Sequence, residues 1–316
     1  MPEKKKLLLT SAGGLTGTYL IKHLRNCAPD IELIGIDTNV NCPAASWLNA
    51  FCVVPKLNSP SFEDVFKEFI ATQKPNFLIP VASHDVDYFS AMKDLYPMKM
   101  LIMDYAEHMK LHDKKNAYAF LRDNGIDTPQ EVKKNEISFP CVLKKRKDSG
   151  SKNTHILQNM KEYEFWSERT PENFLVEFLE GDEFTVDCLF DKNGRCIGAN
   201  PRKRIKTIGG GAVVSVNCPS EPVDEMIERL ETLGTIRGPV NFQYKRLSSG
   251  RRVVFDFNTR FASGGLPLTV QSGFDIPMLL VNLLLDVPVK AWHRDDSISG
   301  LTMIRYFDEM FVRKTI

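Results

Sequence analysis

Residues 253–265 read Val-Val-Phe-Asp-Phe-Asn-Thr-Arg-Phe-Ala-Ser-Gly-Gly, and this is the most specific stretch of the sequence. Its first half alternates as a half-buried strand does, so Asp256, Asn258 and Arg260 share one face while Phe255 and Phe257 point into a core. Burying an acid, an amide and an arginine on one face is costly unless they bind something. We therefore expect this strand to carry part of a binding site.

A neighbouring strand is predicted at Asn241-Phe242-Gln243, with Gln243 on the same face as Asp256 and Asn258. Hard oxygen ligands suit Mg²⁺, which takes few protein ligands together with substrate phosphates. Arg260 would offset charge that develops on a transferred phosphoryl group. A structural network of ion pairs is the alternative interpretation. The glycines at 264 and 265 favour a loop that substrate approaches.

Further upstream, Lys144 ends a predicted buried strand over 141–143. An ammonium projecting into a cleft from that position suits phosphate oxygens. The segment 147–152, Lys-Asp-Ser-Gly-Ser-Lys, has small residues that let backbone N–H groups approach a phosphate. We expect the segment 147–154 to cover phosphates; a solvated basic hairpin is the alternative.

Between these two regions, residues 176–183 read Val-Glu-Phe-Leu-Glu-Gly-Asp-Glu. The backbone edge over 177–179 could pair with an adenine ring, and a carboxylate one turn later could accept from ribose hydroxyls, as acids do in other nucleotide sites. The alternative is an ordinary strand–turn–strand with exposed acids.

The first third of the chain alternates strand and helix signals. Strands are predicted at 7–9, 31–36, 77–79 and 100–103, with helices around 19–24 and 62–70. This alternation favours a parallel sheet covered on both faces. From about residue 110 the pattern changes to an α+β part with mostly antiparallel strands, at 141–143, 174–178, 184–190, 213–216, 241–245 and 253–257. Helices are expected at 114–124 and 222–233, and a buried helix near 278–285.

The loop 12–17, Ala-Gly-Gly-Leu-Thr-Gly, follows a strand and opens a helix, and Asp37 ends the next strand. This imitates a dinucleotide-binding fingerprint, although Ala12 replaces its first glycine, which weakens the NAD interpretation. The run 84–87, His-Asp-Val-Asp, follows another strand. It is either a patch facing substrate, through Asp87, or a helix N-cap. We expect four histidines to be surface or packing residues without metal-ligand spacing: His23, His108, His155 and His293.

In this order and spacing, the three constellations resemble the ATP-grasp superfamily, in particular the ATP-binding modules of carbamoyl-phosphate synthase large chains and similar stand-alone ligases. The resemblance covers almost the whole chain. It implies an α/β fold with a Rossmann-like parallel-sheet pre-ATP-grasp domain over 1–110. An ATP-grasp domain over 111–316 would follow, with a small lobe over 111–178 and a large lobe over 179–316. The loops of the first domain would wall the acceptor-substrate site.

The resemblance also assigns roles to residues. Lys114 would be the basic residue opening the ATP-grasp part, and Lys144 would contact the α- and β-phosphates. The backbone of Glu177, Phe178 and Leu179 would hold adenine, and Glu183 the ribose. The metal and phosphate ligands would be Gln243, Asp256 and Asn258, and Arg260 would be the catalytic arginine.

This sequence departs from the family at Asp256, where the family commonly has glutamate. The loop after Lys144 is also poorer in glycine and lacks the usual proline directly after the lysine. These departures bear on details of the phosphate loop.

The reaction implied uses ATP and Mg²⁺, for which Mn²⁺ could substitute, to activate a carboxylate as an acylphosphate that an amine then attacks. Alternatives are phosphorylation of bicarbonate or carbamate, an NAD-dependent oxidoreductase, and a non-catalytic ATP-binding module. Arg202 and Arg204, close to the glycines at 209–211, would contact an anionic substrate, or else form a solvated basic turn.

The overall composition gives no reason to expect a strongly charged partner. The chain has 316 residues, 43% of them hydrophobic, and its net charge is only +1. No overall field favours nucleic acid or a membrane surface. The seven cysteines lack C-x-x-C spacing, which indicates reduced thiols and disfavours a zinc site. We expect a cytoplasmic protein with small-molecule substrates. A homo-oligomer remains open.

Overall fold

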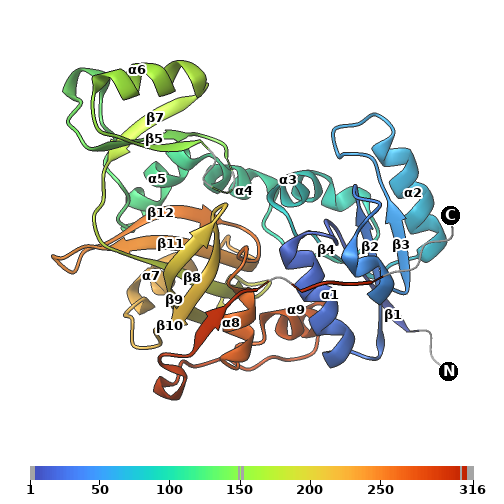
Figure 1. The fold of residues 1–316 in the computed structure, drawn as a ribbon. Coiled ribbons are helices and arrows are strands. Elements are labelled where there is room, and N and C mark those ends of the chain that lie inside the picture. Colours follow the sequence, from blue (N-terminus) through green and yellow to red (C-terminus); the bar gives the residue numbers. More distant parts are fainter. Residues whose placement is uncertain (1–3, 149, 151–152, 307, 312–316) are drawn as a thin grey trace.

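The computed structural model describes residues 4–148, 150, 153–306 and 308–311, and it contains three sheets (Figure 1). The first is parallel, in the order β3-β2-β1-β4. Its strands are β1 (Lys5–Leu9), β2 (Ile31–Asp37), β3 (Ala50–Val53) and β4 (Phe77–Ile79). The helices beside it are α1 (Leu15–Cys27), α2 (Phe62–Gln73), α3 (Ser83–Met92) and α4 (Tyr105–His112).

Both faces of this sheet are buried, as the alternation of strands and helices predicted. Leu7 and Leu9 pack with Leu20 of α1, whereas Leu8 packs on the other face with Phe66 of α2. Successive residues of a strand point to opposite faces, so the continuous run at 7–9 serves two cores at once.

The prediction of a strand at 100–103 is wrong. Only an isolated parallel bridge between Phe77 and Lys99 joins this segment to β4, and residues 100–104 continue without regular structure into α4. Ile102 and Met103 are nevertheless buried. A short apolar run reports burial and does not by itself distinguish a strand from an extended core segment.

The second sheet is small and antiparallel, in the order β6-β5-β7. It contains β5 (Cys141–Lys145), β6 (Thr154–Leu157) and β7 (Asn173–Glu177). Helix α5 (Lys114–Asp123) contributes Tyr118 to one of its faces, and α6 (Met160–Arg169) places Trp166 against the other. Figure 1 shows this layer standing apart from the parallel sheet.

The third sheet is antiparallel, in the order β12-β11-β8-β9-β10-β13. Its strands are β8 (Asp182–Phe190), β9 (Cys196–Ile208), β10 (Gly211–Asn217), β11 (Gly238–Arg246), β12 (Arg252–Asn258) and β13 (Thr302–Ile304). The helices that accompany it are α7 (Asp224–Thr232), α8 (Leu266–Gln271) and α9 (Ile276–Leu284). Short 3-10 helices lie at Pro43–Trp47, Lys93–Leu95, Lys134–Glu136 and Asp296–Ile298.

One hydrophobic core joins the parallel sheet to the third sheet. Leu9 and Leu20 belong to the same buried cluster as Phe261, Ile276 and Leu280. The small sheet has separate, smaller clusters. The predicted domain limit between 110 and 111 falls inside α4, and the lobe limit between 178 and 179 falls between β7 and β8; both limits stay predictions. None of the described helices has the length and apolar character needed to cross a membrane.

Candidate active site

A cleft of about 470 Å³ separates the small sheet from the third sheet. Apolar side chains of the small sheet, Val142, Ile156 and Val176, form one wall. Nearly every site residue predicted from sequence lines it: Lys114, Lys144, Glu177, Phe178, Leu179, Glu183, Arg202, Arg204, Gln243, Asp256, Asn258 and Arg260. Asp87 does not, and lies in a neighbouring cavity.

One end of the cleft offers backbone groups from the connection between β7 and β8. The Glu177 N–H is already used, because it donates to the Gln130 carbonyl at 3.0 Å. Leu179 is only 8% exposed, and within the described ranges its N–H has no hydrogen-bond partner. Unpaired buried N–H groups are rare in native proteins, so this donor is suited to a ligand.

Next to this end, Glu183 is held by a cation. Its carboxylate lies 2.7 Å from Nη1 of Arg204, which also bonds the Gln243 side chain. Nη2 of Arg204 donates to the Gly210 carbonyl at 2.7 Å. Burial lowers the pKa of Arg204, and the nearby Glu183 opposes that shift. Arg204 thus connects the predicted ribose carboxylate with one of the predicted metal ligands.

Arg202 lies deeper, at 1% exposure, and pairs with Asp187 at 2.8 Å. Its Nη1 is buried without a partner among the residues the structure describes. Arg202 lines the cleft, and a buried unpaired donor of this kind calls for an explanation.

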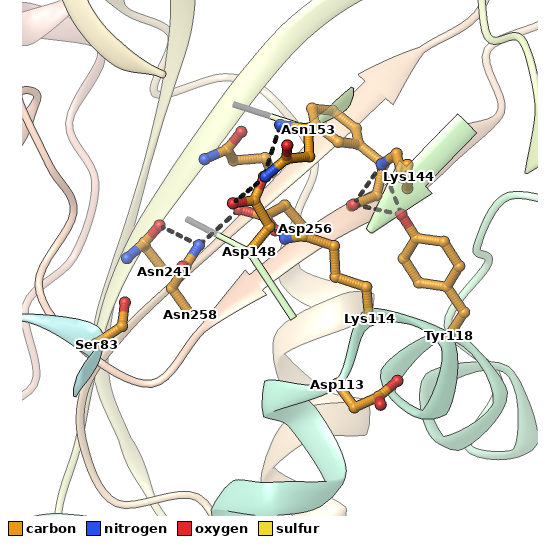
Figure 2. Close-up of polar contacts among 12 residues, drawn as sticks. Ser83, Asp113, Lys114, Tyr118, Lys144, Asp148, Asn153, Asn241, Asp256 and Asn258 are labelled. Atoms are coloured by element: carbon orange, nitrogen blue, oxygen red, sulfur yellow. Dashed lines mark hydrogen bonds and ion pairs between the residues drawn. The ribbon is translucent and has the colours of Figure 1, made fainter. Parts of the chain in front are cut away.

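Lys144 is the most deeply buried lysine of the cleft. Its Nζ donates to the Tyr118 hydroxyl at 2.7 Å and to the Phe255 carbonyl at 3.1 Å (Figure 2). Burial, together with the positive charge of Lys114, lowers the pKa of Lys144 to about 7. A bound phosphate would supply the negative charge that this ammonium lacks.

Lys114 occupies the first position of α5 because Asp113 caps that helix, accepting from the N–H groups of Lys115 and Asn116. From there Lys114 reaches the Asp256 carboxylate. Burial would raise the pKa of Asp256, but Lys114, the Asn258 amide and Lys144 together outweigh it and lower that pKa to about 2. Asp256 is therefore held as an anion.

Figure 2 shows Asp256, Asn258 and Asn241 joined in one chain of contacts. Asn258 Nδ2 donates to Asp256 at 2.8 Å and lies 3.4 Å from Asn241 Oδ1. The ladder between β11 and β12 sets Gln243 opposite Asp256 and Asn241 opposite Asn258. The cleft therefore presents a carboxylate and amide oxygens from two adjacent strands.

These donors fit a hard divalent cation. Mg²⁺ is normally held by one or two carboxylates plus phosphate oxygens and water. Asp256 supplies the carboxylate, and Asn258 and Gln243 supply amide oxygens that now contact the cations Arg260 and Arg204. In the structure, the Asp256 carboxylate forms an ion pair with the Lys114 ammonium, which lies where a cation would bind.

Arg260 connects the cleft with the first part of the chain. Its Nε donates to the Ser83 hydroxyl at 2.7 Å, and its Nη1 donates to the Phe261 carbonyl at 2.8 Å. Burial lowers the pKa of the guanidinium, while Asp256 opposes that shift. Arg260 lines both the cleft and the neighbouring cavity.

The neighbouring cavity measures about 490 Å³ and lies at the carboxyl ends of β1 and β4. The front glycine loop forms one wall of it, and Lys114, Asp256 and Asn258 are shared with the cleft. The Gly13 N–H donates to Asp37 at 2.7 Å, so the loop already uses this donor internally. Asp85 accepts from Ala82 N–H at 2.9 Å at the start of α3, as a helix-capping acid does, while Asp87 faces the cavity.

Part of the predicted phosphate-covering segment 147–154 lies outside the described residues, at 149, 151 and 152. Asp148 accepts from the Asn153 N–H at 2.9 Å. Gly150 lies close to the hairpin between β9 and β10, since a Cβ on Gly210 would come within 2.7 Å of its Cα.

Sequence reasoning gave no role to Tyr118 and assigned no ligand role to Asn241. Tyr118 lies one helical turn after Lys114, on the same face of α5, and that spacing was available as a signal. Asn241 stands two residues before Gln243 on β11, so alternation alone placed it on the same face.

Residues 169–304 match a family model described as ATP-grasp in the biosynthetic pathway with Ter operon. No curated protein sequence matches the chain. A biotin carboxylase domain of the Hydrogenobacter thermophilus 2-oxoglutarate carboxylase, a dimer with MgADP, ADP and bicarbonate, is similar in structure. Its TM-score is 0.75 at 13% identity, covering 94% of this chain and 73% of that one.

Two further solved structures are similar. An L-amino acid ligase from Bacillus licheniformis has a TM-score of 0.72 at 14% identity, covering 96% of this chain and 79% of that one. N5-carboxyaminoimidazole ribonucleotide synthetase from Thermotoga maritima has a TM-score of 0.68 at 17% identity, covering 92% and 77%. The resemblance to the ATP-grasp superfamily is therefore confirmed: residues 169–304 match one of its families, and the chain has the fold of its ligases.

Proposed function

We propose that this protein is an ATP-dependent ligase that phosphorylates a carboxylate and passes the acyl group to an amine. The proposal rests on the way apolar and charged groups are distributed along the cleft. One end combines apolar walls with the free Leu179 N–H, and the other gathers Lys144, Asp256 and Arg260. That arrangement matches a nucleotide with its base at the first end and its phosphates at the second.

In this proposal the Leu179 N–H and the Glu177 carbonyl contact adenine, beside Phe178. Glu183 accepts from the ribose, and Lys144 contacts the α- and β-phosphates. The protein mainly positions the reactants and neutralises charge, because phosphoryl transfer asks for little covalent chemistry from the enzyme.

Asp256, Asn258 and Gln243 would hold Mg²⁺, or Mn²⁺ as a substitute, together with the phosphates. The cation would neutralise charge on the phosphate oxygens. The related H. thermophilus structure contains MgADP, which supports this choice. Arg260 would face the transferred group and stabilise negative charge as it builds up there.

The acceptor would enter through the second cavity, which shares Asp256, Asn258 and Arg260 with the cleft. Arg202 and Arg204 line the cleft and not the second cavity, so they would contact the anionic substrate from the cleft side. The structurally similar protein from B. licheniformis is an L-amino acid ligase, which favours a carboxylate and an amine as substrates.

A bicarbonate-phosphorylating enzyme is the second candidate, because the H. thermophilus structure holds bicarbonate on a similar fold. The NAD interpretation is disfavoured, since Asp37 already occupies the Gly13 N–H. A non-catalytic ATP-binding module would have no use for Arg260 beside Asp256.

The test is ADP release with ATP, Mg²⁺ and panels of carboxylic acids, each with and without amines, with hydroxylamine added to trap an acylphosphate. We expect ADP and a hydroxamate, both dependent on one class of acid. Release of AMP would contradict phosphoryl transfer. ADP release driven by bicarbonate alone would favour the second candidate, and no turnover with any acid would favour a binding module.

We propose small-molecule partners only, with no nucleic acid or membrane surface, and a cytoplasmic location. Assembly as a homo-oligomer stays a prediction, which analytical ultracentrifugation would test.

A further inference from the structure

A cluster of side chains of the kinds that ligate metals lines the second cavity. Asp87 of α3 faces His108 and His112 of α4, and one ligand atom from each lies within 4.8 Å of the others. The Asp87 carboxylate is 2.7 Å from His108 Nε2 and 3.0 Å from His112 Nδ1. The two histidines are four residues apart on one helix, so they share a face.

The geometry points to a site for a divalent transition metal, Zn²⁺ in particular, held by Asp87, His108 and His112. Two imidazoles and a carboxylate are a common ligand set for zinc, with the fourth position left for water or substrate. The Asp87 carboxylate contacts both rings, at the distances given above. A metal would replace those contacts by ligation with small side-chain shifts.

A hydrogen bond to Thr259 fixes the orientation of the His108 ring. Its Nδ1 lies 2.8 Å from the Thr259 hydroxyl, and its side chain is only 3% exposed. A ligating histidine usually bonds an outer partner through its other nitrogen, which fixes the tautomer and the ring plane. Thr259 follows β12 directly, so the site spans the first part of the chain and the third sheet.

The open side of the cluster faces a cavity. Asp87 and His112 are about one-third and one-fifth exposed, and all three side chains line the 490 Å³ space. A bound cation could therefore take its fourth ligand from a molecule in that space, through an oxygen or nitrogen atom. This inference rests on the cluster alone and does not require the proposed ligase reaction.

A second group of candidate ligands provides a matched control. Among the described residues, His23, Cys27 and Asp275 also lie within reach of one cation, but Cys27 is exposed and none of the three lines the second cavity. Zinc binding there would depend on the Cys27 thiol and not on His112.

The experiment titrates the nucleotide-free full chain with Zn²⁺ against a chromophoric chelator. We expect one tightly bound equivalent in the parent and in Cys27→Ser, and loss of that equivalent in His112→Ala. Asp87→Asn, which keeps the side-chain shape, should also lose it. Thr259→Val should weaken binding about 10- to 100-fold, because it removes only the outer partner.

Substitution with Co²⁺ gives a second readout, since tetrahedral nitrogen–oxygen coordination produces visible absorption bands that should vanish in His112→Ala. Circular dichroism confirms that each variant is folded; if His112→Ala is not, Asp87→Asn and Thr259→Val decide. The inference is overturned if the parent binds no Zn²⁺. It is equally overturned if the folded variants of this cluster keep parental affinity, or if Cys27→Ser is the variant that loses the metal.

Discussion

Lys144 is the residue whose charge depends most on a bound phosphate. Burial and Lys114 lower its pKa to about 7 without ligand, and a phosphate would raise it. ATP binding above pH 7 should therefore be accompanied by the uptake of one proton. The affinity for ATP should be constant below pH 7, and above it should decrease by up to about tenfold for each pH unit.

Calorimetry in buffers of different ionisation enthalpy measures this proton uptake. Lys144→Arg, always charged, should abolish it; uptake unchanged in that variant would assign the proton elsewhere.

Asp256 and Arg260 line the same cleft, but substitutions at the two positions should change different kinetic properties. Asp256→Asn removes the only carboxylate proposed to hold Mg²⁺, so the Mg²⁺ requirement should rise. Arg260→Ala should lower turnover by about 100- to 1,000-fold and weaken ATP binding much less, because its charge acts on the transferred group. Turnover measured across a Mg²⁺ series separates the two. Because removing one partner of a buried charged pair can unfold a domain, folding is checked first. Folded variants with parental kinetics would make this face structural.

The positions of side chains along a strand follow from the sequence, whereas contacts between side chains of different helices do not. Strict alternation is enough to place Asp256, Asn258 and Arg260 on one face. By contrast, His108 and His112 stand four residues apart, a spacing that sequence reasoning passed over, and their third partner, Asp87, comes from another helix. Nothing in a single sequence indicates that α3 and α4 pack together.

At the scale of elements, the start of α1 gives a paired test. A Cβ on Gly17 would lie 2.4 Å from the Ser11 carbonyl oxygen, whereas a Cβ on Gly14 would meet that atom at an ordinary 3.4 Å. Gly17→Ala should therefore destabilise the protein by about 1–3 kcal/mol, as overpacking does. Gly14→Ala should leave stability nearly unchanged. Thermal unfolding measures both, and equal midpoints for the two variants would refute this packing account.

The elements that sequence reasoning found are those with a clear period and a core face. β8, β11 and β12 were expected within a few residues of their limits, and so was α7. β9 was missed because its second half, from Lys203 to Ile208, carries charged and exposed residues. Its pairing with β8 and β10, and not its own pattern, makes it a strand. The reverse error at 100–103 came from reading burial as strand structure.

At the scale of the whole molecule, the small sheet is the part with the least core to hold it. Its clusters around Tyr118 and Leu143 are separate from the large core that joins the other two sheets. Regions with few buried apolar contacts open most readily. Hydrogen exchange should therefore be fastest in β5 to β7 and should slow there on adding ATP with Mg²⁺, because the nucleotide would bridge this sheet to β11 and β12. Protection confined to the front glycine loop would contradict this.

The central claim is that ATP binds between the small sheet and the third sheet, and not on the front glycine loop. Calorimetric titration of ATP with Mg²⁺ into the parent, Lys144→Ala and Gly14→Ala tests it most directly. We predict that Lys144→Ala weakens ATP binding, because it removes the buried lysine from the cleft. Gly14→Ala should bind ATP as the parent does, since its new methyl group meets no close contact. Unchanged affinity in folded Lys144→Ala together with lost affinity in Gly14→Ala would contradict the account.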